Sequence, residues 1–386
     1  MSGIVLSAAV RQNLLSLQDT AALLSTTQNR LATGNKVNSA LDNPTNFFTA
    51  QGLNNRASDI NNLLDSIGNG VQVLQAANTG LTSLQKLVDT AKSIANQVLQ
   101  APAGYTAKST ATSAAAVLGT AANLVDGTGI KSGETIGFAA SGELPALTVT
   151  IAATESLDQL NTALAAGGLT ASLDSSNKLV FTTTNDYAGQ TIGAITLGSA
   201  GTTTFGGPTA PVADAASQAI RTSLVNQYNG IITQITTTAQ DSSFNGINLL
   251  NGDNLKLTFD ETAKSTLTVS GVTYNAAGLG LGSLTVGTDF TDNASANAAL
   301  TKLGSASTVL RTEASALGSN LSVVQLRQDF NKSLINVLQT GASNLTLADA
   351  NEEAANSQAL STRQSIAVSA LALANQSQQS VLQLLR

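Results

Sequence analysis

The side chains that most often carry acid–base, nucleophilic or metal chemistry are scarce in this chain of 386 residues, which contains no Cys and no His. Without Cys there are no disulfides, thiolate metal sites or thiol nucleophiles. Without His the commonest general base and metal ligand is missing. An enzyme would have to rely on carboxylates, Lys or Ser, and no arrangement of these side chains indicates a catalytic site. We therefore predict that the protein is not an enzyme and has no catalytic, cofactor-binding or metal-binding residues.

Three short motifs resemble chemical sites, and each is better explained by local structure. DSSFNG at 241–246 begins like a calcium-binding loop, but Gly252 stands where the bidentate Glu belongs, which favours a turn. The glycines at 278–282 lack the spacing of a phosphate-binding loop and the helix that follows one. Glu352 and Glu353 have no basic partner nearby in the sequence, and acidic residues in a first turn stabilise a helix N-terminus. None of the three motifs indicates a ligand site.

The low charge of the chain limits its partners. Only 11% of the residues are charged, against about 25% in an average domain, and the net charge is −6. The 18 basic residues are scattered singly, so no basic patch suits nucleic acid or an anionic membrane. No apolar run approaches the ~18 residues of a membrane span, and we expect no cleaved secretory signal. We expect neither nucleic acid nor a membrane as a partner.

The most informative stretch is 349–386, which has no Pro or Gly and no charge between Arg363 and Arg386. It predicts a helix whose broad apolar face consists of two neighbouring rows at alternating steps of three and four residues. One row comprises Ile366, Ala370, Leu373 and Leu384, and the second comprises Ala367, Leu371, Ala374, Val381 and Leu385. A face of this width requires a partner.

The other end of the chain offers a partner for that face. Residues 2–33 predict a helix with a heptad stripe of Val10, Leu14, Leu17, Ala21, Leu24 and Leu31. Two such helices cannot cover each other's broad faces, so the remaining apolar surface needs other subunits. We predict subunit assembly through Val10, Leu14, Leu17, Leu24, Leu31, Ile366, Ala370, Leu371, Leu373, Val381, Leu384 and Leu385.

Between these ends, the periodicity changes twice along the chain. Helical stripes run over 44–100 and from about Ala294 to Leu345, and a further helix resumes near Ala213. Residues 102–212 are rich in Gly, Thr, Ala and Ser, which predicts a β-rich unit. We expect strands at 135–138, 147–151, 169–173 and 178–183, a helix at 157–165 and a turn at 175–177.

The predicted fold class is mainly α. Long antiparallel, coiled-coil helices from both termini form a rod, with a small β-hairpin at 255–272 and an inserted β-rich (α+β) surface domain. The predicted domains are an inner coiled-coil terminal domain (1–43 plus 344–386), an outer helical core (44–101 plus 213–343) and a variable surface domain (102–212). The alternative is two unrelated coiled coils that flank a globular domain. We favour paired ends because the helical pattern breaks near 34–44 and again near 341–349.

Five stretches carry a family resemblance: LATGNKVNSALDNPTNF at 31–47, RASDI at 56–60, DSSFNGINLLNGDNL at 241–255, ADANEEAANSQALSTRQ at 348–364 and ALALANQSQQSVLQLLR at 370–386. In this order they resemble bacterial flagellin, the subunit of the flagellar filament. Residues 154–183 also look like a repeat found in some flagellins and hook-associated proteins. The best-known flagellins carry their variable domains after the DSSFNG-like hairpin, whereas this chain carries its insert earlier.

The resemblance implies a structural subunit that polymerises through its terminal helices into the extracellular helical filament used for swimming. It implies export in an unfolded state through the flagellar type III channel without a cleaved signal. The implied partners are further copies of the chain, a flagellar export chaperone, the filament cap and hook-associated junction proteins. Two alternatives stay open: a hook–filament junction protein, which shares the termini but caps instead of polymerising, and a flagellin whose insert adds adhesion.

Overall fold

The computed structural model describes residues 8–198 and 203–384, which form two compact units. The terminal unit comprises Met1–Gly70, Lys256–Leu267 and Val323–Arg386, and the central unit comprises Val71–Leu255 and Thr268–Ser322. The boundary between the units falls inside two long helices and not at their ends. The three predicted domains, which are divided at helix ends, stay a prediction.

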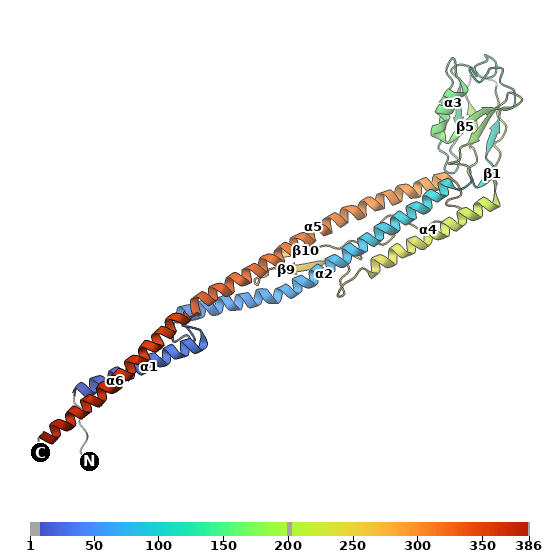
Figure 1. Cartoon of the computed structure of the whole chain (residues 1–386). Helices are drawn as coiled ribbons and strands as arrows, with labels where there is room; N and C mark the ends of the chain where they lie inside the picture. Colours follow the sequence, from blue (N-terminus) through green and yellow to red (C-terminus); the bar gives the residue numbers. More distant parts are fainter. Residues whose placement is uncertain (1–7, 199–202, 385–386) are drawn as a thin grey trace. The chain divides into compact units, whose positions relative to one another are not determined.

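Helices make up most of the described chain (Figure 1). They are α1 (Ala8–Thr33), α2 (Pro44–Gln100), α3 (Leu157–Leu164), α4 (Ala215–Asp241), α5 (Asn293–Thr346) and α6 (Ala350–Leu384). The mainly α fold class and the long helices at both ends of the chain are confirmed. Asn43 caps α2, since its side-chain oxygen accepts the backbone N–H of Asn46 at 3.0 Å. Pro44 then occupies the first position, where its missing N–H leaves no bond unmade.

In the terminal unit, α1 lies antiparallel to α6 (Figure 1). The loop between α1 and α2 and the segment between α5 and α6 join these two helices to the rest of the unit. Backbone hydrogen bonds connect that loop to that segment. Lys36 N donates to Thr346 O at 2.8 Å, and Ala348 N donates to Gly34 O at 2.9 Å. Gly34 has a φ of 71°, the left-handed conformation that ends many helices. The two breaks predicted from the sequence are therefore hydrogen-bonded neighbours.

The terminal unit also contains the tip of the predicted hairpin, whose strands are β9 (Leu255–Thr258) and β10 (Thr266–Val269). Asn331 on α5 donates its side-chain N–H to the carbonyl of Phe259 at 2.9 Å. The Arg327 guanidinium lies 5.8 Å from the centre of the Phe259 ring. From α2, Arg56 reaches Glu261 at 2.7 Å. Side chains from both long helices therefore hold the tip.

The central unit contains the rest of α2 and α5 together with α4. The sequence places Ile220, Leu224, Tyr228, Ile231 and Ile235 on one face of α4. The structure buries Leu224, Tyr228 and Ile235, whereas Ile220 is exposed and Ile231 half-buried, and it also buries Arg221 and Ile232. Hydrophobicity alone does not indicate the burial of Arg221, whose guanidinium finds hydrogen-bond acceptors inside the fold.

Arg221 fixes the base of the insert inside the central unit. Its guanidinium donates to the carbonyls of Pro102 at 3.2 Å and Phe290 at 2.9 Å, and to the Asn293 side chain at 3.2 Å. Burial lowers the pKa of Arg221, an effect opposed by the charge of Asp292. Burial also disfavours the charged form of Asp292 and therefore raises the pKa of its carboxyl. The segment that enters the insert is thus tied to the start of α5 by a hydrogen-bonded buried cation.

The insert is a small α+β body with its own core. Its strands are β1 (Tyr105–Ala107), β2 (Thr110–Thr112), β3 (Thr135–Phe138), β4 (Leu147–Thr150), β5 (Leu169–Leu173), β6 (Leu179–Thr183), β7 (Ile195–Leu197) and β8 (Val212–Ala213). They form antiparallel sheets in the orders β2-β6-β5, β4-β3-β7 and β1-β8. The rings of Phe138 and Phe181, from two different sheets, meet edge to face at 5.0 Å. The four strands, the helix and the turn expected here are confirmed.

Candidate assembly surface

The candidate functional site is the pair of helices α1 and α6, which carry the predicted assembly residues other than Leu385. The structure divides those residues into two groups. Val10, Leu17, Leu24 and Leu371 are buried or partly shielded. Leu14, Leu31, Ile366, Ala370 and Leu373 are exposed. The side chains of Val381 and Leu384, and the whole of Leu385, lie outside the described residues.

On α6 the two sequence rows take different roles. Ala367, Leu371 and Ala374 form a shielded row in the helix pair, whereas Ile366, Ala370 and Leu373 form an open row. Ile366 is 64% exposed and Leu373 is 69% exposed. Burying a side chain of this size is worth about 1.5–3 kcal/mol, so the open row is an unsatisfied apolar surface. Val368, which the sequence rows did not include, is also exposed.

The seam on α1 is more polar than the sequence stripe suggested. The structure buries Thr20 and Thr27, whereas Ala21 and Gln28 are exposed. The Thr20 hydroxyl donates to the carbonyl of Ser16 at 2.7 Å, so its burial leaves no hydrogen bond unmade. Val10, Leu17 and Leu24 stay inward, but the inward positions between them move by one residue to Thr20 and Thr27. Leu14 and Leu31 therefore face outward with Leu15 and Leu23. The exposed Leu15 and Leu23 lay outside the expected stripe. Their apolar side chains were the only sequence feature that could have indicated them as surface residues available for contact.

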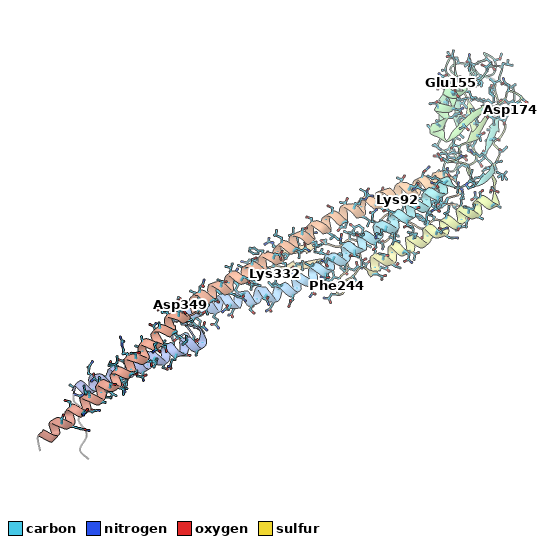
Figure 2. The ribbon with its side chains drawn as sticks, viewed as in Figure 1. Lys92, Glu155, Asp174, Phe244, Lys332 and Asp349 are labelled. Atoms are coloured by element: carbon cyan, nitrogen blue, oxygen red, sulfur yellow. The ribbon has the colours of Figure 1, made fainter. Side chains whose placement is uncertain are left out.

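An ion pair joins the two helices close to the hydrogen-bonded breaks. Arg30 Nη1 on α1 lies 3.3 Å from Glu353 Oε1 on α6. Glu353 is buried and Arg30 is partly shielded. Glu353 has no basic partner nearby in the sequence, but folding brings it one that lies 323 residues away. Figure 2 labels Asp349, just before α6, whose carboxylate accepts the backbone N–H groups of Asn351 and Glu352 as a cap.

The described residues give little basis for ligand chemistry. Across residues 8–198 and 203–384, no three acidic side chains lie close enough to hold a metal ion. Nor does any helix in that part of the chain have a stretch long and apolar enough to cross a bilayer. The turn at 241–246 has Asn245 and Gly246 at positive φ, 51° and 80°, with Phe244 and Ile247 bonded across it. The helix pair therefore remains the candidate site.

Comparison with known families finds two matches, one at each end of the chain. Residues 5–128 match the bacterial flagellin N-terminal helical region. Residues 300–385 match the bacterial flagellin C-terminal helical region. Together the two matched ranges cover more than half of the chain and include α1, α2 and almost all of α5 and α6.

Curated relatives are similar to this chain over part of its length. Flagellin FljM of Caulobacter vibrioides is 35% identical over 167 residues, which is 42% of this chain and 59% of that protein. Flagellin FljK of the same organism has the same identity and coverage. Flagellin A of Rhizobium meliloti is 36% identical over 93 residues, 24% of each chain. The chain thus spans about three fifths of the length of the Caulobacter relatives it matches.

Proposed function

This chain belongs to the bacterial flagellin family, and on that premise we propose that it is the structural subunit of an extracellular flagellar filament. The chain polymerises through α1 and α6, and the filament serves swimming motility. One observation carries the proposal: Ile366, Ala370 and Leu373 form an apolar row that the partner helix leaves uncovered. A contiguous exposed apolar surface of this kind is typical of a protein interface.

The proposed polymer has three levels. Residues 1–43 and 344–386 form an inner coiled-coil layer, residues 44–101 and 213–343 an outer helical layer, and residues 102–212 a surface domain. The shielded row of α6 holds α1 within one subunit, and the open row contacts neighbouring subunits. Leu14 and Leu31 on α1, with Val381, Leu384 and Leu385 at the end of the chain, belong to the same contact surface.

The proposal extends to partners and route. The chain leaves the cell unfolded through the flagellar export channel without a cleaved signal. An export chaperone binds it before export, and the filament cap and hook-associated junction proteins contact it during assembly. Its role is structural, without catalysis.

Seeded elongation tests the proposal. Purified chain is added to short filament seeds, and length is followed by electron microscopy. We expect filaments that grow in proportion to added chain. Seeds that stay at their original length in the presence of excess folded chain would contradict a filament subunit and favour a junction protein.

A further inference from the structure

One leucine on the loop between α1 and α2 has an almost fully solvent-exposed side chain. The side chain of Leu41 is 97% exposed, the highest value among the large apolar side chains that the structure describes. Single exposed apolar residues are common on protein surfaces. This one is unusual because hydrogen bonds fix the loop that carries it.

The loop is fixed at its tip and at its base. The Asp42 carboxylate accepts the backbone N–H of Asn38 at 3.0 Å and of Ser39 at 2.9 Å, and also the Ser39 hydroxyl. These bonds, the Ser39 backbone bond first, lower the pKa of Asp42. At the base, Lys36 N is bonded to the carbonyl of Thr346. Leu41 is therefore presented in a defined place, where it acts as an apolar knob.

A shallow, mainly apolar hollow lies on α5 of the same unit. It is lined by Asn336, Val337, Thr340, Gly341 and Asn344 and presents mainly carbon. Val337 is 67% exposed, so it offers an apolar wall. Gly341 leaves room, because a side chain added there would meet only Leu53, at 3.5 Å. In Figure 2 this part of α5 lies between the labelled Lys332 and Asp349.

Other grooves of the terminal unit suit a leucine less well. The groove between α1 and α6 contains Leu23 and Leu360 but is also lined by charged side chains such as Arg30 and Glu353, which a leucine placed there would desolvate. Amide side chains, including Asn38 and Gln51, make up half of the lining of the groove beside the knob itself. The hollow at Val337 contains no charged side chain, which matches an uncharged knob.

We propose that Leu41 of one copy of the chain seats in the hollow at Val337 and Gly341 of a second copy. In an open polymer each copy places its Leu41 against one neighbour and receives the Leu41 of another, so the contact is heterologous and repeats along the polymer. The inference rests on the proposed polymerisation, to which it adds a specific contact outside the α1–α6 pair.

Disulfide cross-linking tests the contact, because the natural chain has no Cys and offers a clean background. Filaments of Leu41→Cys/Val337→Cys chain are oxidised and run on a denaturing gel without reductant. We expect a ladder of covalent multimers. The matched control is Leu41→Cys/Leu326→Cys, in which the second Cys replaces another exposed leucine on α5. Monomer from the Val337 pair, whether unlinked or closed within one chain, overturns the inference, as does an equal ladder from the control.

A second measurement does not depend on the cysteine variants assembling. Leu41→Ser should raise the critical concentration for seeded elongation about tenfold, since it removes a leucine from the contact. Leu118→Ser, which changes another highly exposed leucine, in the central unit, should leave it unchanged. Equal critical concentrations for Leu41→Ser and the unmodified chain would refute the contact. If the unmodified chain fails to elongate seeds, the filament proposal itself fails, so the two failures are distinguishable.

Discussion

Leu371 and Leu373 stand two residues apart on α6, yet Leu371 is shielded in the pair with α1 whereas Leu373 is 69% exposed. Positions two apart on a helix do not share a face, so neighbouring leucines serve different contacts. The intramolecular seam and the open surface of α6 can therefore be changed separately.

Substituting these two leucines should separate folding from assembly. We expect Leu373→Asp to leave the helicity and thermal unfolding of the monomer unchanged and to abolish seeded elongation, because a carboxylate would be buried between subunits. Leu371→Asp should impair both, since it places a charge in the α1–α6 seam. Circular dichroism and electron microscopy provide the two readouts. Normal filaments from Leu373→Asp would show that the open row is not an assembly surface.

The ion pair between Arg30 and Glu353 should stabilise the α1–α6 pair modestly. Arg30→Met removes the cation and leaves a buried carboxylate without its charged partner. We expect a loss of about 1 kcal/mol, smaller at high salt, measured as faster amide exchange in the last turns of α1 and first turns of α6. Arg11→Met, at an exposed position on the same helix, is the control. Equal exchange rates in the two variants would mean that the pair contributes nothing measurable.

Glycine at position 80 lets α2 approach the 241–253 segment in the central unit. A side chain at Gly80 would overlap the Ser242 hydroxyl and come within 2.7 Å of Leu250. Gly80→Ala should therefore destabilise the unit by about 1–3 kcal/mol, despite the better helix propensity of Ala. Gly304 on α5 has open space around it, so Gly304→Ala should stabilise by up to about 1 kcal/mol. The free energy of unfolding of both variants is measured in urea. A stabilised Gly80→Ala would contradict the close approach of α2 to the 241–253 segment.

The buried phenol of Tyr228 should make the central unit sensitive to alkali. Burial, with a smaller effect of Asp289, raises the pKa of Tyr228 to about 12. In the unfolded chain this phenol ionises near pH 10, so between the two values the unfolded state binds fewer protons and stability falls as pH rises. The loss from this group is on the order of 2–3 kcal/mol by pH 12. Tyr228→Phe should lack that part of the decline in urea unfolding between pH 9 and 12. An equal loss of stability with rising pH in the unmodified chain and in Tyr228→Phe would contradict the contribution of Tyr228.

Much of the fold could be predicted because local signals agree with the tertiary structure. Asn43 with Pro44 indicated a helix start, and Gly34 indicated a helix end, as the structure has them. The alternating residues of 169–173 and 178–183 indicated paired strands for the same reason. Arg221 gave no such signal, because its acceptors at Pro102 and Phe290 are brought to it only by folding.

The sequence by itself determined the helices, the breaks between them, the inserted β-rich unit and the fact that α6 carries two apolar rows. Which row faces α1 was decided only by the tertiary structure. A face broader than one heptad stripe lets a partner helix pack on either row, and a rotation by one residue changes which side chains it covers. In the folded pair, α1 buries Thr20 and Thr27, and Ile366 and Leu373 on α6 stay exposed. The residue types show that a helix has a broad apolar face, and the position of the neighbouring helix decides which part of that face is covered.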